Sequence, residues 1–505
     1  MENNIRFRNH ASVILENSLK TVGTIVFIFV LNFISDIGET GIQFTDVLLL
    51  LGFLIVAIAL VVGFHAIIWA KTYITIEENT LVVERNTLNK KRNTIGLKTI
   101  SNVNLEQNLL EMLLGTSKVK LDTNSLSTAD QTDVNIVLKK ADAENFRRLV
   151  LAKAEGRDDF IDGIEVNIGE TTADSSITNK KPQGMEAFET EENTLIGDLG
   201  DIILHGLYSI RISTLLFLIV IFGVQFFAII DMGIENLGTN IVDIMASLVA
   251  TFWFVAIMLW TIVKEFVKYI GFKIQRKKDK VYLSYGLFKK IAYSVPVDKI
   301  NGIRLTQTWI ARLFKRYMVE IINVGMDDDE NETNTFFLPY SKLENIQEQL
   351  HMLLPEFDGA IEIKEEKQPK EIWLLSIPWL ILYVMIVGVA YVIVLEIEAE
   401  LKIAILVAAA VILLWRTITK FARFLTRGIK VDDNFLKIVD GGFGKRTLFV
   451  KYDKIQYVTG KQCVIAKHFK IQKGTISLLA SMKNRIHELP YFKENDMEQL
   501  KNKLI

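Results

Sequence analysis

The chain has 505 residues, of which half are hydrophobic, and its mean hydropathy is positive at +0.27. This length is enough for three or more domains, and such hydropathy is unusual for a soluble protein and indicates membrane-spanning segments. The net charge of −1 gives no indication of a nucleic-acid partner, and the single cysteine, Cys463, excludes an intrachain disulfide and a cysteine-based metal cluster.

The N-terminal part of the chain predicts a membrane hairpin. Residues 1–20 are basic and lack the apolar core and small-residue cleavage site of a signal peptide. Apolar runs follow at residues 21–34 and 47–69, and the second is long enough to cross a bilayer with some tilt. We therefore expect a transmembrane hairpin within residues 1–71.

After this hairpin the hydrophobic pattern changes to that of strands. The apolar runs become short and rich in β-branched residues, which is typical of strands joined by turns. Phe146, Leu149 and Val150 have helical spacing and predict one packed face of a helix at residues 142–151. A small β-rich domain closed by this helix is expected at 72–154, with strands at 73–76, 81–84, 119–121 and 134–138.

The same order of segments then occurs twice more. Residues 155–195 are acidic and polar and predict a linker without a packed core. Pairs of apolar runs recur after it, and strand-like segments follow each pair. The expected boundaries are a hairpin at 196–270, a domain at 271–356, a linker at 357–370, a hairpin at 371–427 and a domain at 428–505, with spans at 210–230, 241–263, 372–395 and 401–418.

Residue matches at fixed offsets support an internal repeat. An offset of 200 aligns Ile95 with Val295 and Gln107 with Gln307 without a gap. Gln462 lies at the corresponding position of a third copy, and the matches extend into the apolar runs. This period is too long for a solenoid and indicates that each copy is a domain with its own hairpin.

The basic residues predict the orientation of the hairpins. Lys and Arg gather at one end of the apolar runs, whereas the opposite loops are acidic and carry one basic residue, Lys402. Positive charge beside a span is retained in the cytoplasm. With six spans, a multi-pass protein with both termini and all three domains in the cytoplasm is therefore expected.

The predicted spans carry few polar residues that could serve transport or catalysis. Asn32, His65, Gln225 and Pro378 stand out, and no span has a central acid or base. His65 is better explained as an interfacial histidine than as a proton relay, and Gln225 as an interhelical hydrogen-bonding group. The chain has no metalloprotease, serine-hydrolase or phosphate-loop motif. We predict no catalytic residue, cofactor, metal site or small-molecule substrate.

Two clusters of basic residues beside the predicted spans are the candidate binding residues. One interpretation is that they set the membrane orientation and meet anionic headgroups at about 1 kcal/mol each. The other is a specific lipid-headgroup pocket. The first is favoured because the charges follow the span ends rather than a loop within a domain. The clusters comprise Lys264, Lys268, Lys273, Arg276, Lys277, Lys278, Arg416, Lys420, Arg423 and Arg427.

The second copy contains a set of short motifs between two spans and a closing helix. These motifs are Gly286-Leu-Phe-Lys-Lys290, Val295-Pro-Val-Asp-Lys-Ile300, Gln307 and Phe337-Leu-Pro-Tyr340. The arrangement resembles the bacterial pleckstrin-homology-like (PH-like) membrane family, some members of which contain three such units. The resemblance implies an α+β membrane protein with six transmembrane helices in three hairpins. Each hairpin would be followed by a cytoplasmic PH-like β-barrel capped by a C-terminal helix.

The resemblance also implies a bacterial plasma-membrane protein linked to envelope stress and antimicrobial resistance. Its partners would be the lipid bilayer and either a smaller single-unit relative or a further copy of itself. We favour a non-enzymatic scaffold whose domains bind a partner protein, each other or the inner-leaflet surface, because tethered modules gain avidity. The alternative is a component of a transport or lipid-remodelling system, which needs a polar path formed by residues such as Asn32, His65 and Gln225. An intramembrane enzyme is the least favoured hypothesis.

Overall fold

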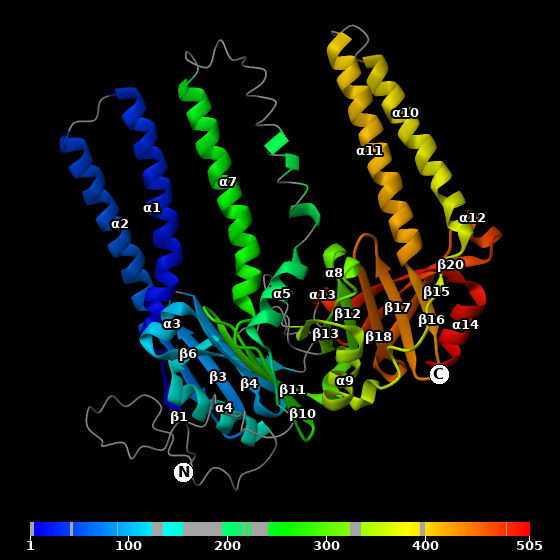
Figure 1. Ribbon diagram of the computed structural model, residues 1–505. Helices are drawn as coiled ribbons and strands as arrows, with labels where there is room; N and C mark the ends of the chain where they lie inside the picture. The colour runs from blue at the N-terminus through cyan, green and yellow to red at the C-terminus, as the bar shows by residue number, and fades with distance from the viewer. Residues whose placement is uncertain are drawn as a thin grey trace. The chain divides into compact units, whose positions relative to one another are not determined.

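The computed structural model contains two compact units, which are described separately (Figure 1). Unit 1 is Met1–Thr194 with Tyr282–Ser294, and unit 2 is Leu195–Val281 with Val295–Ile505. The described residues are 5–40, 44–87, 89–123, 135–154, 194–210, 241–323, 335–393, 399–480 and 482–504, with short pieces of 212–223. The predicted acidic linker therefore lies almost entirely outside the described residues, and the predicted span at 210–230 is described only in short pieces up to residue 223.

Unit 1 contains two β-sheets that share a core with one helix. The first sheet has the order β1-β2-β3-β4, and the second contains β7, β6, β5, β11 and β10 in this order. Helix α4 contributes Phe146, Leu149 and Val150 to the core, all fully buried, so the predicted helix face is confirmed. The bounds are β1 Ile5–Phe7, β2 Thr72–Ile76, β3 Thr80–Asn86, β4 Lys90–Gly96, β5 Ile100–Gln107, β6 Thr116–Thr123, β7 Asn135–Lys139, α4 Lys140–Ala154, β10 Lys280–Tyr285 and β11 Lys290–Pro296.

Unit 2 contains one long antiparallel sheet and one three-stranded sheet. Their orders are β14-β13-β12-β18-β17-β16-β15 and β19-β20-β21. Two amphipathic helices bury one face each, α9 through Ile346 and Leu350 and α14 through Met497 and Leu500. The bounds are β9 Lys273–Lys277, β12 Ile300–Gln307, β13 Tyr317–Asn323, β14 Phe336–Ser341, α9 Leu343–Leu353, β15 Glu366–Lys367, β16 Gly428–Val431, β17 Phe435–Gly441, β18 Lys445–Lys451, β19 Ile455–Lys461, β20 Ile471–Leu478, α13 Met482–Arg485, β21 Ile486–Lys493 and α14 Glu494–Asn502.

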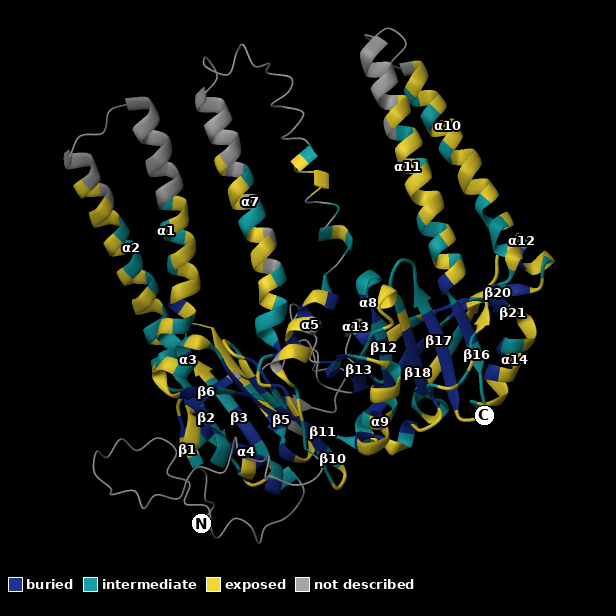
Figure 2. Ribbon diagram, viewed as in Figure 1, coloured by how far each residue is buried: buried dark blue, intermediate teal, exposed yellow. Residues whose placement is uncertain are grey.

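Five long helices correspond to predicted spans. Three described stretches are long and apolar enough to cross a membrane, namely Ser12–Phe29, Leu51–Ala70 and Lys370–Val392. Most of their residues are exposed to the surroundings, as a lipid-facing surface would be (Figure 2). The helices are α1 Ser12–Thr40, α2 Phe44–Ala70, α7 Ile241–Lys268, α10 Ile377–Ile393 and α11 Ala399–Thr426.

A short strand precedes each predicted hairpin and joins the sheet that follows it. β1 pairs with β2, with Ile5 opposite Ile76, and β15 pairs with β16, with Glu366 opposite Ile429. β8, at Thr194–Ile196, lies beside β9 in the same way. The repeated unit is therefore strand, hairpin and domain, and the chain is held to one sheet on both sides of each hairpin. These strands are not predictable from the sequence, because a strand of two or three residues is too short to show an alternation of apolar and polar side chains.

The strands form two separate sheets in each domain, where the sequence analysis expected a barrel. In unit 1, β5 pairs with β11 of the next repeat, so that Gln107 lies opposite Lys290. In unit 2, β12 pairs with β18 of the next repeat, so that Gln307 lies opposite Lys445. At least one of the two edges that would close each barrel is thus hydrogen-bonded to a neighbouring repeat, namely β5 in the first repeat, β11 and β12 in the second and β18 in the third.

Candidate membrane-contacting surface

Each repeat carries a short helix after a strand that ends in glutamine, as β5 and β12 do, or is directly followed by glutamine, as β19 is. The three helices are α3 Leu109–Leu114, α8 Trp309–Leu313 and α12 Val464–His468. Asn108 begins α3 with a capping box, and the Thr308 hydroxyl accepts a hydrogen bond from the Ala311 N–H at the start of α8. Each helix is followed by one residue in the left-handed conformation, namely Gly115, Lys315 and Lys470.

Each short helix lies near the domain end of a hairpin (Figure 1). Asn108 donates from Nδ2 to Glu16 Oε1 of α1 at 3.3 Å, and Lys118 forms an ion pair with the same carboxylate at 2.8 Å. Thr308 donates to the carbonyl oxygen of Tyr208, at the end of α5 (Leu199–Ser209). α12 packs against the 3-10 helix η6 (Lys370–Ser376), which leads into α10. The position of each short helix is therefore fixed relative to the base of a hairpin.

These short helices expose large apolar side chains. Leu113 is 83% exposed, Leu313 is 74% exposed and Val464 is 87% exposed. Leu109, Leu114 and Phe314 are exposed as well. A single exposed leucine is ordinary on a protein surface, but apolar residues at one repeated place beside a membrane hairpin indicate a lipid-facing surface. We call these six residues the apolar tips.

Tryptophans with polar or cationic neighbours lie at the domain ends of membrane helices in both units. The guanidinium of Arg416 lies 4.2 Å from the ring centre of Trp379, and the ammonium of Lys420 lies 5.4 Å from that of Trp373. In unit 1, Trp69 donates from Nε1 to the Asn9 carbonyl oxygen at 2.7 Å. Tryptophan and basic side chains together are typical of the interface between bilayer and water.

The ten basic candidate residues differ in what they contact, and the structure does not gather them into one pocket. Five are exposed, namely Lys264, Lys273, Lys278, Arg416 and Arg423. The other five, Lys268, Arg276, Lys277, Lys420 and Arg427, are half-buried.

Arg276 and Arg427 are held by carboxylates of the protein. Arg276 donates to both Glu356 oxygens at 2.7 and 2.9 Å and to the Leu353 carbonyl oxygen at 3.0 Å. The guanidinium holds the pKa of Glu356 below its ordinary value. Arg427 donates to Asp440 at 2.6 Å. The exposed lysines and arginines are therefore better placed to contact lipid headgroups than Arg276 and Arg427.

Replacing Arg276 by methionine is expected to lower the free energy of unfolding of unit 2 by about 1–3 kcal/mol, because four hydrogen bonds from the charged guanidinium are lost, two of them to the Glu356 carboxylate. Lys264→Met is the matched control, since Lys264 is exposed and its replacement should change stability by less than about 0.5 kcal/mol. Thermal unfolding of the full chain in detergent measures both. Equal midpoints for the two variants would contradict the structural role of Arg276.

Helix α5 carries a buried histidine. His205 is fully buried, and its Nδ1 accepts a hydrogen bond from the Tyr340 N–H at 3.2 Å. The rings of Tyr269 and Phe336 lie 4.6 and 5.4 Å from it. Burial, with a smaller effect of the Lys268 charge, lowers the pKa of His205 to about 3. A neutral imidazole without an acidic partner among these neighbours is a packing group, not a proton relay.

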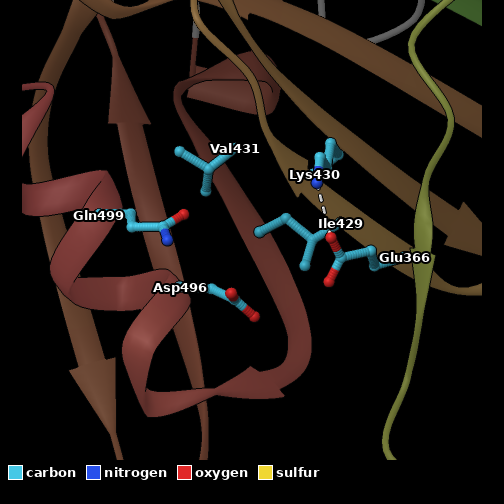
Figure 3. Close-up of a pocket in the computed structure, with 6 residues that line it drawn as sticks. All are labelled: Glu366, Ile429, Lys430, Val431, Asp496 and Gln499. Carbon is cyan, nitrogen blue, oxygen red and sulfur yellow. Dashed lines mark hydrogen bonds and ion pairs between the residues drawn. The ribbon is translucent and has the colours of Figure 1, made fainter.

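Two pockets lie among the described residues of unit 2. Figure 3 shows a pocket in which Glu366 pairs with Lys430 at 2.6 Å, while Asp496 and Gln499 extend from α14. Its volume of about 10 Å³ is at the lower limit for one water molecule. Burial and the charge of Glu366 raise the pKa of Asp496. The pocket is therefore too small for an organic substrate.

The second pocket is a cleft of about 440 Å³, and four of its eight lining residues are acidic. Its lining residues are Glu356, Asp358, Asp433, Asn434, Phe435, Lys451, Tyr452 and Asp453. This set contains no histidine, serine or cysteine that could act as a nucleophile with a neighbouring base. Within the described part of the chain, no group of three or more His, Cys, Asp or Glu residues could hold a metal ion.

Of the three residues expected to form a transport path, the structure describes the side chain of one, His65. Gln225 and the side chain of Asn32 lie outside the described residues. His65 is half-buried, and its ring packs edge-on against Phe64 at 5.7 Å. The transport hypothesis therefore stays a prediction.

Comparison with known proteins identifies the repeated domain. The Bacterial PH domain family matches residues 26–154, 217–353 and 380–505. A Bacillus subtilis (strain 168) protein described as "UPF0699 transmembrane protein YdbT" is 26% identical over 101 residues, which is 20% of this chain and 20% of that protein. The matched region thus spans about a fifth of that relative. No solved structure matches the chain.

Proposed function

Because the chain belongs to the bacterial PH domain family, we propose that it is a non-enzymatic membrane scaffold whose three PH-like domains bind the bilayer surface and one another. The resemblance noted in the sequence is confirmed by the three family matches. The relative is described as a transmembrane protein, and the apolar helices agree with a membrane location. PH-like folds host binding rather than a fixed chemistry, and function must be argued from surfaces.

The proposed topology has six spans in three hairpins, with both termini and every domain on the cytoplasmic side of a bacterial plasma membrane. The distribution of Lys and Arg beside the spans supports this orientation. The proposed role of the scaffold is in envelope stress or antimicrobial resistance, and the family resemblance is what supports it. Its partners are the bilayer and either a smaller single-unit relative or a further copy of itself.

The observation that carries the proposal is the repeated position of the apolar tips. Each lies on a short helix that packs at the base of a hairpin, beside exposed basic residues. Burying one leucine side chain away from water stabilises by about 1.5–3 kcal/mol, and each nearby cation adds about 1 kcal/mol at an anionic surface. The tips would therefore hold the domains against the inner leaflet.

Spin labels test this contact in the full chain reconstituted into liposomes with anionic lipid. With Cys463 replaced by serine, a label at Leu313→Cys is expected to be accessible to oxygen, which concentrates in lipid, and shielded from a water-soluble nickel complex. The control is Asp433→Cys, since the Asp433 side chain is 94% exposed and follows β16 at the end remote from α11. Equal exposure of both labels to the nickel complex would refute membrane contact by the tips.

The alternative function is a component of a membrane transport or lipid-remodelling system. The three repeated hairpins motivate it, because transporters are often built from repeats. A flux assay in the same liposomes would favour transport if an ion or lipid crossed the bilayer only when the protein was present.

A further inference from the structure

The repeats present an equivalent edge strand three times, and two of these strands are paired with the next repeat. β5 pairs with β11 in unit 1, and β12 pairs with β18 in unit 2. Both pairings are antiparallel and place a glutamine opposite the first lysine of the incoming strand. The third strand of the series, β19, lies at the edge of its sheet, and no described strand pairs with its outer side.

The glutamine that follows β19 makes the same hydrogen bond as the glutamines at the ends of β5 and β12. Gln107 donates to the Thr116 carbonyl oxygen at 2.7 Å, Gln307 to that of Arg316 at 3.0 Å and Gln462 to that of Ile471 at 3.1 Å. In each repeat the side-chain amide is thus bonded within its own domain. Proteins usually protect a free strand edge with charged residues, but β19 carries no charge from Ile455 to Gly460.

β4, the edge strand of the first sheet in unit 1, has the opposite character. It begins with Lys90, Lys91 and Arg92, all exposed, which is a typical protected edge. If β4 of a second copy joined β19 in the register of the internal junctions, Lys90 would face Gln462 and Lys91 would face Lys461. Like charges directly opposite each other destabilise a strand pair, so the wild-type chain disfavours its own β4.

The position of Lys461 also indicates the charge of the missing strand. In the first repeat this position is Glu106, whose carboxylate binds Lys289 beside the incoming strand at 3.3 Å. Lys461 reverses that charge. A strand that pairs with β19 would therefore be stabilised by an acidic residue, and tolerated with an uncharged one, opposite Lys461.

We propose that β19 is an acceptor edge for the first-sheet edge strand of a PH-like domain on a second protein. The strand pairs antiparallel with β19, places a basic residue opposite Gln462 and carries an acidic or uncharged residue opposite Lys461. This inference rests on the proposed scaffold function, because it names the kind of partner that the scaffold binds. It does not depend on lipid contact by the apolar tips.

A disulfide between two copies tests the acceptor edge and its register, with a second copy altered in β4 as the probe. In the proposed register, Asn89 lies opposite Cys463, and both residues are exposed. Opposite Cα atoms in an antiparallel pair are about 4.5–5.5 Å apart, which a disulfide can bridge. Three variants of the full chain in liposomes are compared under mild oxidation: N89C, N89C/K91E and N89C/K91E/K461E.

We expect N89C/K91E to form about five-fold more disulfide between position 89 and Cys463 than N89C, because an opposite-charge pair replaces a like-charge pair. The triple variant should return to the low level, since it restores like charge at the same pair. Non-reducing gels give the yield, and mass spectrometry of the cross-linked peptide identifies the two joined positions. Cys463→Ser in the N89C/K91E background should abolish the product.

Equal yields in all three variants would overturn the proposal, as would a product that does not join position 89 of one copy to Cys463 of the other. No product from N89C/K91E would also overturn it, provided that its thermal midpoint equals that of N89C. If the disulfide forms as expected but the spin labels at the apolar tips are exposed to water, the acceptor edge is retained and membrane contact by the tips is rejected. Failure of this proposal is therefore distinguishable from failure of the proposed membrane contact.

Discussion

Gly302→Ala is expected to destabilise unit 2 by about 1–3 kcal/mol, the usual cost of overpacking a close contact, and Gly302→Val by more. Gly302 lies in β12 opposite Val450 of β18. A Cβ atom at this position would lie 2.7 Å from the Phe449 carbonyl oxygen, a distance that real Cβ atoms essentially never show. The strands would have to separate, and the backbone pairing between the second and third repeats would weaken with them.

The contacts beside Gly302 increase the expected effect. Asn301 donates to the Leu479 carbonyl oxygen, and Arg304 donates to Asn484 at 2.7 Å. Both reach from β12 into the third repeat on either side of the glycine. A shift of β12 would lengthen these bonds together, so the second and third repeats should unfold at separate temperatures in the variant.

Scanning calorimetry of the full chain in detergent, combined with limited proteolysis, measures this separation. Faster cleavage is expected at the 357–370 segment, which connects the two repeats. Gly96→Ala in β4 is the matched control, because its nearest contact would be an ordinary 3.5 Å to Thr99 and its φ of −68° suits alanine. A similar loss of stability in both variants would mean that the close approach at Gly302 is not the cause.

The sequence predicts the repeated architecture because its determinants are local. The closing helix α4 follows from the spacing of Phe146, Leu149 and Val150, and the hairpins follow from long apolar runs. Gln107 and Gln307 are recognisable as equivalent residues from their offset alone. Their pairing with strands of the next repeat is not, because the backbone groups of two distant strands leave no periodic signal in either sequence.

The candidate surface is less predictable for a similar reason. The ten basic residues are recognisable in the sequence because they lie close to the predicted spans. The ion pair of Arg276 with Glu356 is not, because the two residues are 80 positions apart and meet only in the folded chain. Leu113 and Leu313 have the residue type of core positions, and only the packing of their helices beside a hairpin shows that they are exposed. Charge placement is thus readable from sequence, whereas charge pairing and exposure depend on contacts between distant segments.

Acidification is expected to destabilise unit 2 through His205, by about 1.4 kcal/mol for each pH unit below 6.5. Burial lowers the pKa of His205 from 6.5 to about 3 in the folded chain. Between these values the unfolded chain binds a proton that the folded chain does not, so unfolding is favoured as the pH falls. The loss of stability through His205 therefore begins near pH 6.5 and is complete near pH 3.

His205→Phe removes this titration and should flatten the pH dependence of the thermal midpoint between pH 6.5 and 4.5, where the wild type is expected to lose about 2–3 kcal/mol through this group. At neutral pH the variant should be less stable by about 1–3 kcal/mol, because the Tyr340 N–H loses its acceptor. The variant is therefore expected to be less stable at neutral pH and less sensitive to acid. Its curve of thermal midpoint against pH should approach that of the wild type as the pH falls.

His487 must be separated from this effect, since burial also lowers its pKa, to about 4, with a smaller effect of the Arg304 charge. His487→Asn alone should leave the His205 part of the slope in place, and the double variant should remove both parts. If His205→Phe retained the full wild-type slope while His487→Asn removed it, the acid sensitivity of unit 2 would belong to the sheet of β21 and not to the aromatic pocket around His205. If the two single variants each removed part of the slope and their effects added, the two histidines would act independently, as expected for groups in separate cores.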